Sequence, residues 1–172
     1  FAGIYLEDLK KFSNIFNKSF SKKHFLIFGI NTQDNSSNEF YNSLIVSNNN
    51  LEVLYKYDKK KLVPFGEFMP FYDFFEKFGL KKITQGYGSF SKGKKQKNFI
   101  SNNLNILPLI CYEIIFPNLT QFSDKKTNMI VNISEDAWFG NSIGPHQHFT
   151  KAIFRSVENN TYLVRSANKG IS

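Results

Sequence analysis

Hydrophobic and polar positions along the chain predict alternating helices and strands. In residues 5–20, apolar side chains recur at intervals of three and four, which predicts an amphipathic helix. The buried stripe of that helix would consist of Leu6, Leu9, Phe12 and Phe16. Residues 24–30 form a short, continuous apolar run that is typical of a buried strand, and the polar residues 31–39 predict a loop.

The central part of the chain predicts a hairpin, a loop and a helix. Residues 41–47 and 51–57 read as two strands joined by a turn at 48–50. Residues 62–70 have proline at both ends of a glycine-containing loop. Pro70 would begin a helix that ends before Gly79. Its apolar stripe, which could instead join a lipid-facing rim, would consist of Phe71, Phe74, Phe75 and Phe78.

The second half of the chain continues the alternation. The Gly- and Lys-rich residues 86–97 predict a loop, and a helix should begin after Gly144-Pro145, with apolar positions at Phe149, Ile153 and Val157. Buried strands are predicted at residues 106–110, 128–134 and 161–167. Strands that alternate with helices in this way predict a layered α/β domain.

Composition narrows the class of protein. The chain has 172 residues, of which 41% are hydrophobic and 21% charged, which indicates one folded domain rather than a disordered segment. No apolar run approaches the roughly 18–20 residues that a membrane-spanning helix needs. Residues 1–25 also lack the order of segments that defines a signal peptide.

The net charge of +8 favours anionic partners. The lysines are scattered, however, apart from small clusters at residues 59–61 and 92–97, and the sequence contains no zinc-finger, RRM or KH signature. We therefore predict a solvated basic face and no nucleic-acid partner. The single cysteine excludes an internal disulfide framework and a multi-cysteine metal site.

That cysteine, Cys111, is the first candidate for chemistry. A lone cysteine is often inert core, but Cys111 follows a buried strand, at a position where α/β folds present nucleophiles. A reactive thiol needs a nearby base or cation. His146 and His148 are separated by one residue, so they point to different sides of a helix, and no metal site is predicted. Spacing alone does not select one of the lysines 59–61.

Three segments carry a family resemblance: YDKKKLVPFGE, PLICYEIIFP and VNISEDAWFGNSIGPHQHF. Together they resemble the nitrilase, or carbon–nitrogen hydrolase, superfamily, and within it the apolipoprotein N-acyltransferase branch. The resemblance covers about residues 41–172. It implies an α-β-β-α sandwich, which here would be one partial catalytic domain over residues 1–172, incomplete at both ends and without the flanking transmembrane regions of that branch.

The resemblance also implies the site. Cys111 matches the nucleophile, and Lys59, eight positions before Glu67, matches the catalytic lysine. The supporting residues would be Glu67, Glu113 and Tyr112. The substrate rim would be lined by Asp136, Trp138, Phe139 and, from the aromatic loop around Glu67, Phe68.

The third catalytic residue of the family, a general-base glutamate in a W-P-E segment, has no match in this sequence. Glu7 and Asp8 belong to the helix that follows that segment, so neither is assigned, and the base is expected upstream of Phe1. The 172-residue fragment alone should therefore be inactive. Glu135, where the family usually has Asn, and Lys169, in what is usually a T-N-N-G or T-N-T-G segment, depart from the pattern.

The implied reaction is a two-step acyl transfer without metal or organic cofactor. A phospholipid would donate an acyl chain to Cys111, and the thioester would pass it to the N-terminal diacylglyceryl-cysteine of an apolipoprotein. The enzyme would act as a monomer at the bacterial inner membrane, with its catalytic domain on the periplasmic side. Two alternatives remain: a soluble nitrilase-type amidase that acts on a small amide, and a non-catalytic basic binding domain.

Overall fold

The computed structural model describes residues 6–68, 70, 89–94, 96–120 and 127–172. Within these residues the strands form two sheets, one of three and one of four strands. The first sheet is antiparallel in the order β1-β2-β3, and its strands are β1 (Leu26–Asp34), β2 (Glu39–Ser47) and β3 (Val53–Asp58).

The hairpin of β2 and β3 is confirmed, but the loop predicted at residues 31–39 is shorter than expected. Residues 31–34 continue β1 and pair with residues 39–42 of β2, which leaves only a short turn. The sequence reads as polar there because one face of this part of β1 is solvated, while Thr32 is buried and hydrogen-bonded to Ser43. The alternation of buried and exposed positions was not visible in the sequence, because the buried residue Thr32 is itself polar.

The second sheet positions the site. Its strands are β4 (Phe99–Ser101), β5 (Leu104–Ile110), β6 (Met129–Glu135) and β7 (Tyr162–Asn168). β4 pairs antiparallel with β5, whereas β5, β6 and β7 are parallel to one another. The carboxyl ends of these three parallel strands therefore meet at one edge, which is where ligands bind in open α/β sheets. The short strand β4 was not predicted.

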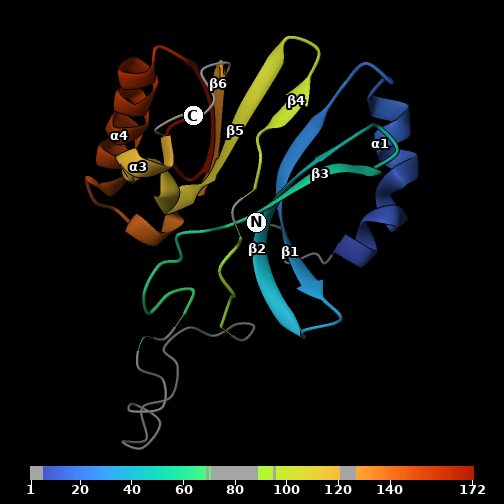
Figure 1. Ribbon diagram of the computed structural model, residues 1–172, viewed down its shortest axis with the longest axis horizontal. Helices are drawn as coiled ribbons and strands as arrows, with labels where there is room; N and C mark the ends of the chain where they lie inside the picture. Colours follow the sequence, from blue (N-terminus) through green and yellow to red (C-terminus); the bar gives the residue numbers. More distant parts are fainter. Residues whose placement is uncertain (1–5, 69, 71–88, 95, 121–126) are drawn as a thin grey trace, which may run out of the picture.

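Helices cover the outer face of each sheet (Figure 1). On one side lie the 3₁₀ helix η1 (Leu6–Phe12) and the helix α1 (Ser13–Ser19), which together match the helix predicted at residues 5–20. On the other side lie α3 (Pro117–Thr120) and α4 (Gly144–Asn159). The 3₁₀ helices η2 (Cys111–Ile115) and η3 (Asp136–Phe139) follow β5 and β6 directly. The predicted α-β-β-α sandwich is confirmed.

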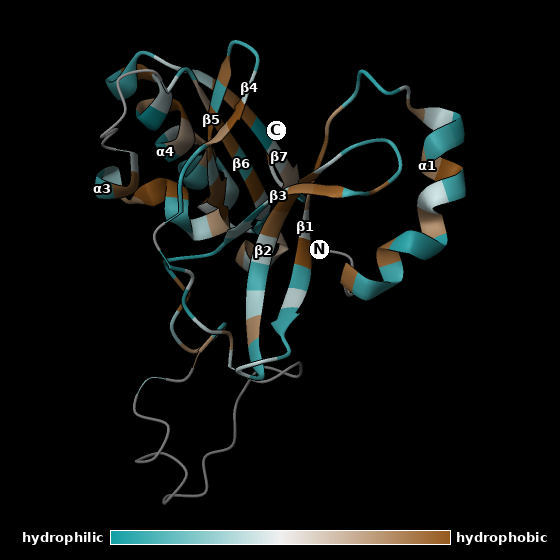
Figure 2. Ribbon diagram, turned by 45° about the vertical axis from the view of Figure 1, so that its right-hand side comes forward, coloured by the Kyte–Doolittle hydropathy of each residue, from teal (hydrophilic) through white to brown (hydrophobic). Residues whose placement is uncertain are grey.

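Three apolar clusters hold these layers together, and Figure 2 shows hydrophobic stretches on β3 and mixed character along α1. The cluster between the sheets consists of Leu44, Val46, Tyr57, Phe99, Ile106, Ile110, Val131 and Ile133. A second cluster, of Leu109, Ile114, Ile130 and Ala152, joins α4 to the second sheet. The third, of Leu9, Ile30 and Ile45, joins η1 to the first sheet. Burial of this apolar surface is the main stabilising contribution.

The predicted helix after Gly144-Pro145 is confirmed as α4, but its buried face is not its apolar stripe. The buried residues are His148, Ala152 and Arg155, whereas Ile153 and Val157 are exposed. The helix predicted to begin at Pro70 falls largely on residues 71–80, which lie outside the described residues. In the part of the chain that is described, no helix has the length and apolarity to cross a membrane.

Candidate active site

Lys59 is the member of the lysine triplet that the fold buries. It follows the last residue of β3, and its side chain is 1% exposed. Its backbone N–H donates to the Asn42 carbonyl at 2.9 Å, and its own carbonyl accepts the Gly93 N–H at 2.8 Å. Lys60 and Lys61 are half-buried, and their ammonium groups lie over the rings of Tyr57 and Phe116. Burial therefore distinguishes Lys59 where spacing could not.

The partner of Lys59 is Glu67. The Lys59 Nζ lies 2.9 and 2.8 Å from the two carboxylate oxygens of Glu67. Glu67 also accepts the Asn42 side-chain amide at 2.6 Å and the Val63 N–H at 2.8 Å. These donors fix the carboxylate at the base of the loop, and a partly buried pair with this geometry holds the ammonium in one place.

Cys111 stands where β5 ends and η2 begins. It is half-buried, is not in a disulfide, and packs at the margin of the cluster between the sheets. Its φ angle is 50°, in the left-handed region that non-glycine residues rarely adopt. Such a conformation persists only where surrounding contacts enforce it, and it is typical of functional positions.

Glu113 fastens this turn to the segment that carries Lys59. Its carboxylate is fully buried and accepts N–H groups from Ile110 at 2.8 Å, Lys60 at 2.7 Å and Lys61 at 3.0 Å. Burial raises the pKa of Glu113, while the three N–H donors and the charge of Lys59 act in the opposite direction. One carboxylate is thus shared by the segment that follows Lys59 and the segment that precedes Cys111, although it bonds the backbone beside Lys59 and not Nζ.

The hydroxyl of Tyr57 completes the shell around Glu113. It lies 3.0 Å from each carboxylate oxygen, and burial together with the charge of Glu113 raises the pKa of Tyr57. Tyr112, which was predicted as a supporting residue, points elsewhere: its ring packs edge-on against Phe116 with the centroids 4.9 Å apart. Its described contacts therefore brace the turn from the side of η2.

The residues predicted to line the substrate rim differ in their exposure. Trp138 is 73% exposed and Phe139 is 39% exposed, both on η3 at the edge where the parallel strands end. Phe68 is half-buried in the loop that carries Glu67. Asp136, also predicted at the rim, is fully buried instead, because its carboxylate turns inward to Ser134, His148 and Arg165.

His148 is a residue of this site that the sequence did not reveal. It lies on the buried face of α4, with one ring nitrogen near Asp136 and the other near the Cys111 carbonyl. Burial and the neighbouring charge of Arg165 lower the pKa of His148, and Asp136 opposes them. The pKa of Asp136 is lowered although burial acts against this, because hydrogen bonds and the charge of Arg165 outweigh burial. The signal in the sequence that could have identified His148 is its place four residues before Ala152, on the same face of the helix.

The two departures from the family pattern occupy the same edge. Glu135 accepts the Ala137 N–H at 3.1 Å and the Asn168 side-chain amide at 2.6 Å, so it caps η3 and joins β6 to β7. Lys169 has a φ of 51°. A left-handed φ is unfavourable for lysine, so this turn carries some conformational cost.

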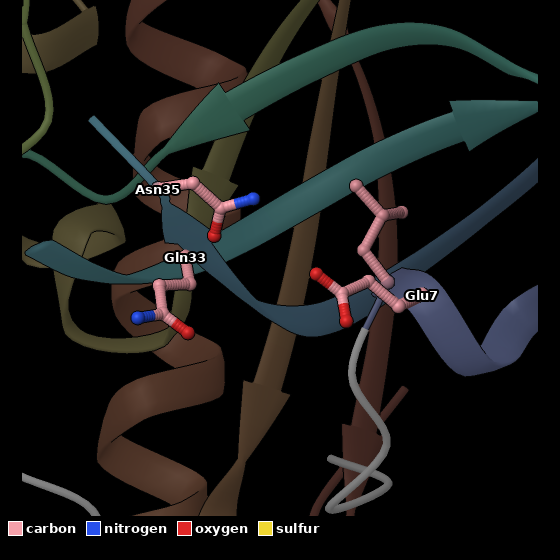
Figure 3. Close-up of a pocket in the computed structure, with 4 residues that line it drawn as sticks. Glu7, Gln33 and Asn35 are labelled. Carbon is pink, nitrogen blue, oxygen red and sulfur yellow. The ribbon is translucent and has the colours of Figure 1, made fainter. Parts of the chain in front are cut away.

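Glu7 lies on the far side of the first sheet from Cys111. It lines a pocket with Leu6, Gln33 and Asn35, between η1 and the end of β1 (Figure 3). Among the described residues, no group of His, Cys, Asp and Glu side chains has a metal-binding arrangement.

Comparisons with known proteins identify the family of this chain. The family model for carbon–nitrogen hydrolase matches residues 7–172. Apolipoprotein N-acyltransferases are similar in sequence: that of Rhizobium leguminosarum bv. trifolii is 42% identical over 134 residues, and that of Bradyrhizobium diazoefficiens 44% over 133. Each match covers 77% of this chain but only 25% of the relative, so the chain spans about a quarter of their length.

Solved structures show the same fold. Saccharomyces cerevisiae Nit3, of the nitrilase superfamily, has a TM-score of 0.64 at 24% identity, covering 94% of this chain and 49% of that one. A carbon–nitrogen hydrolase from Helicobacter pylori has a TM-score of 0.65 at 16% identity, covering 96% of this chain and 52% of that one. Because the family model matches nearly the whole length of this chain, the chain belongs to the carbon–nitrogen hydrolase family.

Proposed function

We propose that this chain is the catalytic region of an enzyme that transfers an acyl chain from a phospholipid to the N-terminal diacylglyceryl-cysteine of apolipoproteins. The observation that carries the proposal is the joining of two segments by Glu113, which accepts the backbone N–H of Lys60, next to Lys59, and that of Ile110, next to Cys111. The names of the sequence relatives supply the substrate class.

In the first step, the Cys111 thiolate attacks the ester carbonyl and forms a C–S bond. The carbonyl electrons move onto the oxygen, and the tetrahedral intermediate then expels the lysophospholipid alkoxide, which takes up a proton. In the second step, the amine attacks the thioester carbonyl, the C–S bond breaks as the Cys111 thiolate leaves, and the nitrogen gives up one proton to the general base, so that a neutral amide forms. Covalent catalysis of this kind divides one difficult transfer into two easier ones.

The role assigned to Lys59 is to stabilise the oxyanion of the tetrahedral intermediate. An ammonium has three N–H donors, and two of those of Lys59 are directed at Glu67. The third can reach the oxygen on which charge develops, and Glu67 keeps the ammonium in place. The proton of the thiol is assigned to a glutamate outside this chain, since no hydrogen bond joins Cys111 to a carboxylate within the described ranges.

The exposed aromatic residues suit a lipid substrate. Trp138 and Phe139 are accompanied by Ile143, 67% exposed, and by Phe65, 51% exposed in the loop that carries Glu67. Large apolar side chains exposed beside a site are characteristic of surfaces that bind apolar ligands or membranes. Together with the net charge of +8, they support binding at an anionic membrane surface. The surface that we propose is the periplasmic side of the bacterial inner membrane.

The test uses the full-length protein with a phospholipid and a diacylglyceryl lipopeptide. Mass spectrometry should find an acyl group on Cys111 when the lipopeptide is omitted, and an N-acylated lipopeptide when it is present. Cys111→Ala should give neither product. Hydrolysis of small amides without acyl transfer would establish the amidase alternative, and complementation of a depletion strain by Cys111→Ala would establish a non-catalytic binding role.

A further inference from the structure

A buried polar network lies behind the turn that carries Cys111. His148 is 4% exposed, and its Nε2 lies 3.2 Å from the carbonyl oxygen of Cys111. Its Nδ1 lies 2.9 Å from Asp136 Oδ1 and 3.2 Å from Arg165 Nη2. The ring therefore connects α4 and η3 to the first residue of η2.

The same network returns to β5. Arg165 donates to Asp136 Oδ2 at 2.7 Å and to the side-chain oxygen of Asn132. Asn132 in turn donates its amide to the Leu109 carbonyl at 3.1 Å. The network thus holds two backbone carbonyls, those of Leu109 and Cys111, which are two residues apart. It fixes the chain just before and at the nucleophile.

The partners of the two ring nitrogens show that Nε2 of His148 is the donor to the Cys111 carbonyl. A carbonyl oxygen only accepts, so the contact is a hydrogen bond when Nε2 carries the proton. Nδ1 faces both an acceptor, Asp136 Oδ1, and a donor, Arg165 Nη2, so it has a partner in either protonation state. Nε2–H donation to Cys111 is therefore compatible with the neutral ring and with the charged ring.

We propose that His148 is a positioning residue, which acts by holding the Cys111 carbonyl and thereby the left-handed backbone conformation of the nucleophile. The inference rests on the proposed function, in which Cys111 is acylated. A φ of 50° is unfavourable for cysteine, and the bond from His148 is one of the restraints that maintain it. Without this bond the backbone relaxes and the thiol moves away from the oxyanion position near Lys59.

The decisive pair of variants is His148→Gln and His148→Met in the full-length protein. The two side chains are similar in length and volume, and both lack Nδ1, but only glutamine keeps a donor near the Nε2 position. We expect His148→Gln to form the acyl-enzyme at least about tenfold faster than His148→Met, since a small misplacement of a reacting group can cost about 100-fold in rate. The KM for phospholipid should be similar in both, because His148 is buried behind the Cys111 turn.

A second measurement separates this inference from the proposed function. Alkylation of Cys111 by iodoacetamide, followed on its peptide by mass spectrometry, reports thiol presentation without any lipid. The glutamine variant should again react at least about tenfold faster than the methionine variant. Failure of the wild type to transfer acyl chains would refute the proposed function, while the alkylation rates would still decide the role of His148.

Equal alkylation and acylation rates in His148→Gln and His148→Met would overturn the inference, whether both are fast or both are slow. His148→Asn keeps a donor toward Asp136 but does not reach Cys111, so it should resemble His148→Met. It replaces the methionine variant if that one does not fold.

Ser134→Ala removes a 2.6 Å bond to Asp136 and leaves the His148–Cys111 contact intact. It should lower the melting temperature yet change the alkylation rate less than about twofold.

Discussion

The carboxylate of Glu113 accepts the backbone N–H of Lys60 at 2.7 Å across a sequence separation of 53 residues. This bond joins a segment of the first sheet to a turn of the second, so the two halves of the candidate site do not depend on apolar packing alone for their spacing. Since Glu113 is fully buried, the bond forms in a medium where an unsatisfied partner is costly.

Replacing Glu113 by glutamine should destabilise the protein and slow acylation. The glutamine oxygen can keep the bonds to Lys60 and Lys61, but its amide would then face the Ile110 N–H, donor against donor. The expected cost is about 1–3 kcal/mol of unfolding free energy, measured by thermal or denaturant unfolding. Glu52→Gln, in the exposed hairpin turn, is the control and should stay within about 0.5 kcal/mol of wild type. Equal effects at both positions would contradict the role given to Glu113.

Lys59→Ala should reduce acyl-enzyme formation by at least about 100-fold, the usual loss when an oxyanion donor is removed. Lys60→Ala and Lys61→Ala, whose ammonium groups lie over aromatic rings, should remain within about threefold of wild type. The measurement is the single-turnover rate of Cys111 acylation. Comparable losses in all three variants would show that the general positive charge of the segment matters, and not Lys59 itself.

Much of the fold was predictable because its elements carry strong local patterns. The apolar runs that became β2, β5 and β6 and the Gly-Pro start of α4 each gave a signal within a few residues. The three-residue strand β4 gave none, since it depends on pairing with β5. The inward face of α4 also escaped detection, because it carries the polar residues His148 and Arg155. His148 is paired there with Asp136, 12 residues away, and Arg155 is bonded to Glu158.

The same reasoning explains which candidate site residues could be named from the sequence. Lys59, Cys111 and Glu67 lie in contiguous motifs, and so a family resemblance identifies them. Spacing alone did not distinguish Lys59 from its neighbours; the resemblance selected it, and in the structure burial sets it apart from Lys60 and Lys61. Asp136 lies in such a motif as well, yet its direction depends on Arg165, 29 residues away. A motif therefore locates a residue near a site without telling which way its side chain points.

Gly170→Ala should destabilise the protein strongly. A Cβ at this position would lie 2.3 Å from Asp136 Oδ2 and 2.6 Å from the Asp136 Cβ. Asp136 is buried and bonded to Arg165, so it cannot move aside cheaply, and we expect a loss of about 1–3 kcal/mol or more. Gly66→Ala is the matched control, since its nearest neighbour would be an ordinary contact at 3.4 Å. Similar melting temperatures for the two variants would refute this account.

Stability should fall as the pH is lowered from about 7 toward 5, in part because of His148. The pKa of His148 is lowered from 6.5 in the folded protein, by burial and by the charge of Arg165. The unfolded chain therefore binds a proton first, so that stability is lost below about pH 6.5 until the folded-state pKa is reached. His148→Gln should flatten this part of the profile of melting temperature against pH. A slope in His148→Gln equal to that of the wild type would contradict the assignment.

Trp138→Ala should weaken the use of phospholipid without loosening the fold. The side chain is 73% exposed, so its removal should change the unfolding free energy by less than about 0.5 kcal/mol. If η3 contacts the lipid, the lost apolar contact should raise the KM for phospholipid roughly tenfold and leave the alkylation rate of Cys111 unchanged. Phe154→Ala removes an aromatic residue that is 51% exposed on α4, away from the edge where the parallel strands end, and should not alter KM. An unchanged KM in Trp138→Ala, or an equal rise in both variants, would exclude η3 as part of the lipid-binding rim.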